Sequence, residues 1–370
     1  MSDTGYLPKE KIKDFLKELA KDAVVYAPCL EGDIVLFRPF SEERTLCLDR
    51  PANTPPKSVI YPQSETLFAF QYKKAPEDHQ KMSVELKADI GVPNMVIFGA
   101  RPCDAKGFRI YDRVFIETNT PDPYYRKRRE NTLIVTLSCA APSPGCFCVA
   151  VGGGPAHKEG SDVMMTELEG GYVIEPVTEK GRAILGKHVI EDGKPYLKDA
   201  QHVQAKAHDE VRNPFAPDEL PKISQSLFNF DGFWEQVVGK CVSCGACTYL
   251  CPTCYCFNIT DEQGIGSGER VRSWDACMFF HFTLEASGHN PRPTKFQRFK
   301  NRVGHKFIYY PEKYEGVIAC CGCGRCIRYC PVNVDISEIV NYLKDTHQEL
   351  HWASSRKEGT QPTVGSTKDE

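Results

Sequence analysis

Two cysteine runs of identical spacing constrain the fold of this chain more than any other feature. Each run reads Cys-x2-Cys-x2-Cys-x3-Cys-Pro, which is the spacing of bacterial ferredoxins that bind a [4Fe–4S] cluster. A loop of this kind wraps three thiolates around one cubane and leaves the fourth ligand to another segment. The sequence therefore predicts two [4Fe–4S] clusters that carry single electrons. The eight cysteines are Cys241, Cys244, Cys247 and Cys251 in the first run and Cys320, Cys323, Cys326 and Cys330 in the second.

The last cysteine of each run is expected to bind the cluster of the other run. This exchange of the Cys-Pro ligand is found in two-cluster ferredoxins. Gly245, Gly322 and Gly324 are expected to let main-chain N–H groups approach the sulfurs. Two zinc sites are the alternative, which explains the Cys-x2-Cys pairs but not the repeated x3-Cys-Pro. The predicted ligand sets are Cys241, Cys244, Cys247 and Cys330 for cluster 1, and Cys320, Cys323, Cys326 and Cys251 for cluster 2.

Composition places the chain among soluble proteins of a reducing compartment. It has 370 residues, 18 cysteines and a net charge of −3. Such a charge gives no field that favours nucleic acid or an anionic membrane, and no apolar run is long enough to span a bilayer. Residues 1–20 lack the apolar segment of a signal peptide. The expected location is the cytoplasm, where cysteines are metal ligands more often than disulfides.

The first half of the chain is expected to form an α+β domain of α/β type. Two continuous apolar runs, residues 94–98 and 133–137, predict strands that are covered on both faces. Periodicity predicts helices at 8–20 and around 108–115, and residues 166–176 predict a hairpin. The expected division is an α/β N-terminal domain at 1–222, an α-helical ferredoxin-type domain with two [4Fe–4S] clusters at 223–352, and a disordered tail at 353–370.

A third group of cysteines lies in the first half. Cys103 and Cys139 each follow one of the two predicted strands, and Cys146 and Cys148 come shortly afterwards. If the strands are parallel neighbours, the first two thiols share the carboxyl edge of one sheet, where open α/β sheets carry their sites. Four thiols suffice for a third [4Fe–4S] cluster, although their spacing matches no standard signature. The alternative is buried thiols with a zinc site.

A long insert, residues 252–319, separates the two cysteine runs. It is expected to be helical, as in the α-helical ferredoxin domain of succinate dehydrogenase iron–sulfur subunits, which the chain resembles in motif alone. Its Cys254, Cys256 and Cys277 are interpreted as buried core residues. The alternative is a further metal site that these thiols form together with Cys321, which also competes with Cys320 for the ligand role.

The insert ends in a basic stretch, residues 289–306, with six Lys or Arg and no acid. Helical spacing predicts that four of its cations share one face. Three interpretations are open: a docking face for an acidic partner, a charge source beside anionic clusters, or an ordinary solvated face. The four cations are Lys295, Arg298, Arg302 and Lys306.

Several motifs together resemble a known family along most of the chain. They resemble the β subunit of cytosolic NiFe sulfhydrogenases and the A subunit of anaerobic sulfite reductase, which are 4Fe-4S dicluster-domain electron-transfer subunits. The tail and residues 177–225 lie outside the resemblance. The matching stretches are residues 62–67, 99–104, 146–148, 152–155, 241–257, 274–278, 286–293 and 320–336.

The resemblance implies a role as the electron-transfer subunit of a multi-subunit oxidoreductase. It implies a partner subunit that binds FAD and NAD(P)H, and a catalytic subunit that holds NiFe, sirohaem or a related centre. The alternatives are a subunit of a heterodisulfide-reductase-like or flavin-based bifurcating complex, or a reductase that uses an open iron at the N-terminal cysteines. No catalytic side chain is expected for electron transfer, and no substrate turnover by this chain alone.

Overall fold

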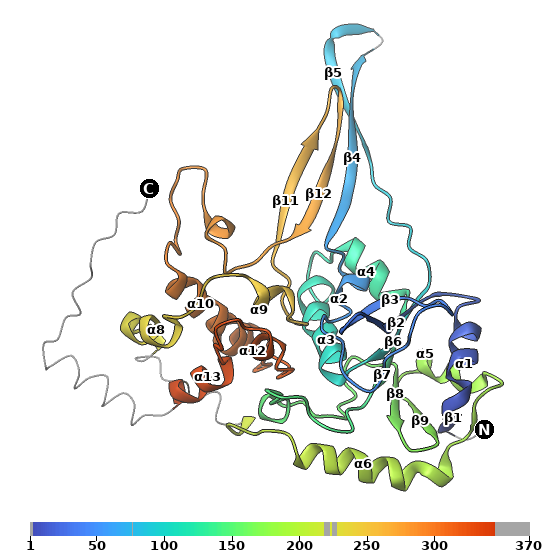
Figure 1. Cartoon of the computed structure of the whole chain (residues 1–370). Helices are drawn as coiled ribbons and strands as arrows, with labels where there is room; N and C mark the ends of the chain where they lie inside the picture. The colour runs from blue at the N-terminus through green and yellow to red at the C-terminus, as the bar shows by residue number, and fades with distance from the viewer. Residues whose placement is uncertain (1–2, 76, 218–222, 224–227, 345–370) are drawn as a thin grey trace, which may run out of the picture.

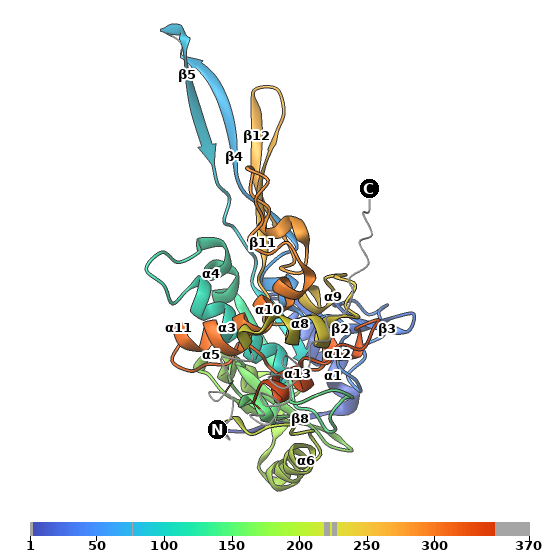
Figure 2. The same cartoon turned by 90° about the vertical axis from the view of Figure 1, so that its left-hand side faces the viewer.

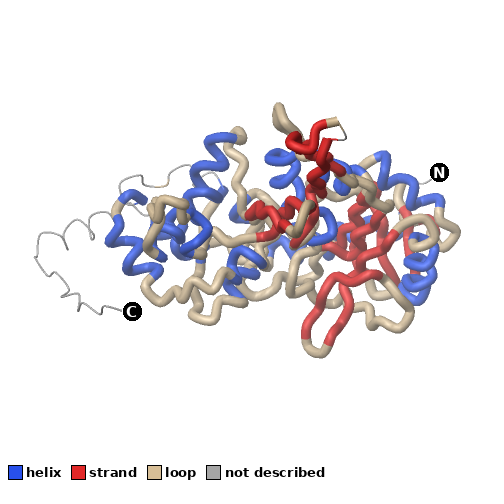
Figure 3. Tube along the Cα trace, turned by 90° about the horizontal axis from the view of Figure 1, so that it is seen from above, coloured by secondary structure: helices blue, strands red, loops and turns tan. Residues whose placement is uncertain are grey.

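The two parts of the molecule differ in secondary structure: one combines strands with helices and the other is mainly helical. The structure, a computed structural model, describes residues 3–75, 77–217, 223 and 228–344. Seen from above in Figure 3, strands are concentrated toward the N-terminal part with helices around them, and the part toward the C-terminus consists mainly of helices and loops. The chain therefore has the mixed α/β character that the sequence predicted.

An eight-stranded mixed sheet forms the centre of the N-terminal part (Figure 1). Its strands are β1 Gly5–Pro8, β2 Val24–Glu31, β3 Ile34–Pro39, β6 Met95–Ala100, β7 Thr132–Leu137, β8 Val163–Glu167, β9 Gly171–Pro176 and β10 Glu191–Asp192. Their order is β10-β1-β9-β8-β7-β6-β2-β3. The pairs β2/β6, β6/β7 and β7/β8 are parallel, and the others are antiparallel. The two apolar runs are therefore parallel neighbours, as required for Cys103 and Cys139 to share an edge.

Helices cover both faces of this sheet. The helices of this part are α1 Ile12–Leu19, α2 Lys57–Ile60, α3 Pro102–Phe115, α4 Pro123–Glu130, α5 Glu179–Arg182 and α6 Leu197–Asp209. Because side chains alternate along a strand, Val96 and Ile97 of β6 face opposite sides. Val96 belongs to the core that includes Phe15 of α1, and Ile97 to the core that includes Phe108 of α3. Apolar packing on both sides explains why the central strands read as continuous apolar runs.

A second, four-stranded antiparallel sheet projects from the body, as Figure 2 shows. It consists of β4 Ser64–Ala75, β5 Asp78–Lys87, β11 Phe257–Gln263 and β12 Ser267–Trp274, in the order β11-β12-β4-β5. β12 pairs with β4, so segments from both halves of the sequence share this sheet. Arg272 of β12 and Glu65 of β4 form a buried ion pair there, with Nε and Oε1 2.9 Å apart.

The prediction of a helical insert is wrong for residues 257–274. These residues form the hairpin β11–β12, with Gly266 in the left-handed region at φ 75°. The hairpin is stabilised by pairing with β4, which lies far away in the sequence. Periodicity within the insert does not reveal such a distant partner, so tertiary pairing decided the local structure.

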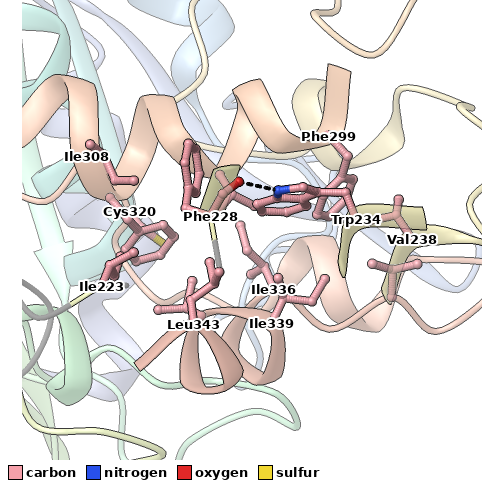
Figure 4. Packing of buried hydrophobic residues seen from close by; sticks show 14 of the residues in the cluster. Ile223, Phe228, Trp234, Val238, Phe299, Ile308, Cys320, Ile336, Ile339 and Leu343 are labelled. Carbon is pink, nitrogen blue, oxygen red and sulfur yellow. Dashed lines mark hydrogen bonds between the residues drawn. The ribbon is translucent and has the colours of Figure 1, made fainter. Parts of the chain in front are cut away.

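The C-terminal part is mainly helical and has its own core. Its helices are α8 Asp231–Val238, α9 Ala246–Tyr249, α10 Lys295–Gly304, α11 Tyr310–Lys313, α12 Arg325–Arg328 and α13 Ile336–Lys344, with a π-helical segment at His305–Tyr309 between α10 and α11. In Figure 4, Ile336, Ile339 and Leu343 of α13 point toward Trp234 and Phe228. The Trp234 indole N–H donates a hydrogen bond to the Phe228 carbonyl at 2.7 Å.

Short 3-10 turns complete the secondary structure of the described residues. They are Lys9–Lys11, Val149–Val151, Ala183–Gly186, Lys194–Tyr196 and Phe280–Thr283. The helix predicted at 8–20 is therefore a 3-10 turn followed by α1, and the hairpin predicted at 166–176 is β8–β9. The expected domain boundary at 222/223 falls between segments that are not described, and the tail at 353–370 lies outside the described residues.

Candidate metal centres

The first cysteine run and the last cysteine of the second run surround one cavity. Its lining includes the thiols Cys241, Cys244, Cys247 and Cys330, and also Cys326 from the second run. Two main-chain N–H groups point at these sulfurs: Ser243 donates to Cys241 at 3.4 Å and Val334 to Cys330 at 3.2 Å. The structure thus brings together the four thiols predicted for cluster 1, including the one from the distant run.

Cys251, the last cysteine of the first run, lies with the thiols of the second run. It is close enough to interact electrostatically with Cys320, Cys323 and Cys326. The Gly322 N–H donates to the Cys320 sulfur at 3.5 Å, as expected for a glycine that lets the main chain approach a ligand. The thiols predicted for cluster 2 therefore also gather in one place, again with the Cys-Pro cysteine exchanged.

The N-terminal cysteines form a third group at the carboxyl edge of the main sheet. Cys103 lies in the first turn of α3, directly after β6, and Cys139 follows β7. Cys139 interacts electrostatically with each of the other three thiols, which are Cys103, Cys146 and Cys148. The strand topology alone predicted the position of the first two, and the loop after β7 brings the other two back to the same edge.

This third group lies directly against the second run. The Phe147 N–H donates to the Gly322 carbonyl at 2.8 Å, and the Cys146 thiol donates to the Cys323 carbonyl at 3.5 Å. Cys103 interacts electrostatically with Cys323. The three thiol groups therefore form a continuous series, with the group around the second run in the middle.

Comparison with known proteins assigns the chain to a family. Residues 240–334 match the 4Fe-4S dicluster domain. Over 348 residues, the chain is 30% identical to the sulfhydrogenase 2 subunit beta of Pyrococcus furiosus, and the alignment covers 92% of this chain and 98% of that protein. The chain belongs to the sulfhydrogenase β-subunit family. It is an iron–sulfur electron-transfer subunit related to that hydrogenase subunit. No solved structure matches it significantly.

Two features are absent from the described part of this β-subunit-family chain. No helix there is long and apolar enough to cross a membrane. Among the same residues, no three His, Cys, Asp or Glu side chains are placed to hold a single metal ion.

Burial disfavours the charged form of several of these thiols. It raises the pKa of Cys320 to about 11 and that of Cys148 to about 12. Metals bind the thiolate form, and the positive charge of a bound metal offsets the cost of holding a thiolate away from water. The donor sets of this β-subunit-family member therefore fit metal centres.

Buried cations surround the thiol groups of this family member. Lys57, Lys106, Arg302 and Lys306 are each at most 6% exposed. Lys106 donates to the Val151 carbonyl at 2.7 Å, and Arg302 to the Cys247 carbonyl at 3.2 Å. In the described part of the chain, none of the four forms a salt bridge with a carboxylate. An isolated buried cation is costly, so thiolates and the anionic clusters that they would hold are the natural counter-charges.

Lys306 has the closest contact with a predicted ligand. Its ammonium lies 3.5 Å from the Cys251 sulfur, 2.8 Å from the Thr253 hydroxyl and 3.2 Å from the Ala319 carbonyl. Burial alone would lower the pKa of Lys306, but the neighbouring thiolates, with Cys251 the foremost, raise it well above its usual value. The lysine is therefore charged and faces the second thiol group.

The basic stretch faces inward. Arg298, Arg302 and Lys306 are buried, and Lys295 donates to the carbonyls of Gly239 and Cys241 at 2.6 and 3.1 Å. The interpretations as a docking face or a solvated face are therefore wrong for Arg298, Arg302 and Lys306, whereas Lys295 is partly exposed. The stretch is a charge source beside the predicted cluster sites.

The remaining cysteines fall in two places. Cys321 is buried beside Cys323 and Cys103, so it lies with the second and third groups. Cys254, Cys256 and Cys277 line a separate cavity on the other side of Arg302 and Lys306. Cys321 therefore does not form a common site with Cys254, Cys256 and Cys277. Sequence analysis missed Lys57 and Lys106, which lie in none of the motifs and whose residue type is normally solvated.

Proposed function

We propose that this chain relays electrons inside a cytoplasmic complex. One partner would be a flavin subunit that binds FAD and NAD(P)H, and the other a catalytic subunit of hydrogenase or sulfite reductase type. The relative from Pyrococcus furiosus is named as one subunit of a sulfhydrogenase, which supports a multi-subunit setting. The chain would work as two units, an N-terminal α/β domain and a dicluster domain.

Three [4Fe–4S] clusters would occupy the three thiol groups. Bound there, they supply one-electron redox chemistry whose potential depends on charge, hydrogen bonds and exposure. The ligands would be Cys241, Cys244, Cys247 and Cys330; Cys320, Cys323, Cys326 and Cys251; and Cys103, Cys139, Cys146 and Cys148.

The observation that carries the proposal is the continuous series of thiol groups. Cys326 lines the cavity of the first group and interacts with Cys251 in the second. Gly322 of the second group lies against the main chain of Cys148 in the third. A series of this kind suits stepwise electron transfer between two surfaces, whereas one isolated site would suit a structural metal.

Protein residues would perform two tasks in this relay. Main-chain N–H groups at Ser243, Gly322 and Val334 point at ligand sulfurs. Such hydrogen bonds would stabilise the reduced form of a bound cluster. The positive charges of the buried cations would also stabilise the reduced clusters, so that a cluster in the interior of the protein is easier to reduce.

Metal and sulfide analysis of the anaerobically purified full chain tests the proposal. We expect about twelve iron atoms per chain with matching acid-labile sulfide, and paramagnetic resonance signals of three reduced clusters. Zinc without iron or sulfide would overturn the proposal. A cluster signal that changes on addition of a small-molecule substrate would instead favour a reductase with an open iron at the N-terminal thiols.

A further inference from the structure

A pair of cysteines that the relay does not use lies in a cavity of its own. Cys256 and Cys277 line a cavity of about 440 Å³ together with Cys254. Its lining also includes Phe257, which is 36% exposed, so the cavity reaches the surface of the protein.

The strand register brings these two cysteines together. Phe257 at the start of β11 pairs with Trp274 at the end of β12, and the Asp275 N–H donates to the Cys256 carbonyl at 2.9 Å. The Cys277 thiol and its main-chain N–H both donate to the Cys256 sulfur. The hairpin therefore places the two side chains next to each other on one cavity, and both residues are free cysteines.

The contact also makes the two sulfurs chemically unequal. Donation from Cys277 lowers the pKa of Cys256, and the same bond raises the pKa of Cys277. The lowered pKa favours the thiolate form of Cys256, and the thiolate is the reacting form in disulfide chemistry.

We propose that Cys256 and Cys277 form a reversible disulfide that stores two electrons beside the relay. The two thiols lose two protons and two electrons as one S–S bond forms, and the reverse step takes up the same number. The protons pass to water through the cavity. The electrons pass one at a time to or from iron–sulfur acceptors in this chain, so the inference rests on the proposed function.

The position of the pair supports this exchange. Cys277 interacts electrostatically with Cys247 of the first thiol group, and its sulfur lies 3.8 Å from the Thr248 hydroxyl on α9. On the same cavity, Cys254 contacts Cys251 of the second group. A dithiol at this point is adjacent to two of the three predicted one-electron sites, so it can couple a two-electron change to single-electron steps.

Cations on the cavity wall add to the argument. Arg302 and Lys306 line it from the inside and Arg292 lies on the same lining. Positive charge stabilises the thiolate form, from which electrons leave more readily than from a thiol. The cavity therefore combines a preformed thiol pair, counter-charge and an opening for protons.

The test is a redox titration of the anaerobic full chain, poised at a series of potentials. Free thiols are blocked by alkylation at each potential, and the peptides are then analysed by mass spectrometry. We expect a Cys256–Cys277 linked peptide that is near zero in the fully reduced protein, predominant in the oxidised protein and lost again on re-reduction. Reductive titration of the wild type should take up about two electrons more per chain than Cys256→Ser or Cys277→Ser.

Matched variants separate this role from metal ligation. Cys256→Ser and Cys277→Ser should keep the iron content of the wild type, as should Cys47→Ser, whose thiol contacts the Asp49 carboxylate at 2.8 Å. Loss of iron in both pair variants would overturn the inference in favour of ligands, and absence of the linked peptide at every potential would overturn it as well. Wild-type chain without iron would instead refute the proposed function, and the inference with it.

Discussion

The two cysteine runs have the same spacing and similar backbones, yet opposite surroundings. Ser243 and Gly322 occupy the same position and have φ of 55° and 61°, and Gly245 and Gly324 have φ of 75° and 69°. In the first run, Cys244 is exposed and its neighbour Val242 is 60% exposed. In the second run, Cys320, Cys321 and Cys323 are all buried.

One position shows where the difference comes from. Ala246 of the first run corresponds to Arg325 of the second, which is 1% exposed and bonds Asp104 on α3 with Nη1 and Oδ1 2.6 Å apart. The first run thus faces the surface, whereas the second is built into the N-terminal half. The shared spacing of the two runs predicts which of their thiols lie together. The residues between the thiols decide whether each run lies near the surface or in the interior of the protein.

The largest expected effect tests the exchanged ligands. Cys251→Ser should remove the cluster of the second run, with loss of about four iron atoms, because Cys251 lies with Cys320, Cys323 and Cys326. Its paramagnetic resonance spectrum should match that of Cys320→Ser, and the spectrum of Cys330→Ser should match that of Cys241→Ser. Damage limited to the run that carries the mutation would contradict the exchange.

The next effect concerns the anchor of the buried run. Asp104→Asn leaves the Arg325 guanidinium buried without its charged partner, and we expect a loss of roughly 3–5 kcal/mol in the free energy of unfolding. Thermal or denaturant unfolding measures it. The control is Asp261→Asn, which breaks the exposed pair with Arg270 and should leave stability almost unchanged. Equal effects of the two changes would show that the buried pair is not the anchor.

A reciprocal exchange at the shared left-handed position gives a smaller effect. A Cβ on Gly322 would lie 2.6 Å from main-chain atoms of Cys148, so Gly322→Ser should cost roughly 3 kcal/mol of stability. Ser243→Gly, the opposite change in the first run, should be tolerated because Ser243 already adopts the same backbone there. If Gly322→Ser and Ser243→Gly changed the free energy of unfolding by the same small amount, the close packing of Gly322 against Cys148 would be refuted. Urea unfolding of the two variants decides the matter.

The smallest effect is a shift in reduction potential. Lys306→Gln removes a buried positive charge beside Cys251, so the potential of the second cluster should fall by roughly 100 mV, as estimated from a charge pair in a medium of intermediate dielectric. Lys295→Gln at the first run should produce a smaller shift, since water screens that lysine. Potentiometric titration followed by paramagnetic resonance compares the two. A larger shift in reduction potential for Lys295→Gln than for Lys306→Gln would contradict the assignment of the second run as the buried site and the first run as the exposed one.

Local patterns predicted the thiol groups well, and long-range packing less well. The grouping of the eight thiols follows from their spacing together with the ligand exchange of two-cluster ferredoxins, and the carboxyl edge with Cys103 and Cys139 follows from two apolar strands. The hairpin β11–β12 was missed because its partner β4 lies in the other half of the chain. Lys57 and Lys106 were missed because a lysine is normally solvated, and only the folded protein shows that these two face thiols and carbonyls.

The shared four-stranded sheet makes the dicluster half a poor candidate for transplantation. Without β4, the hairpin would expose the hydrogen-bonding edge of β12, which invites association with other chains. The Arg272 guanidinium would also lose its partner Glu65. A designer who wants to fuse these electron-carrying motifs to another enzyme therefore has to carry β4 and β5 along, because the smallest portable piece is not contiguous in sequence.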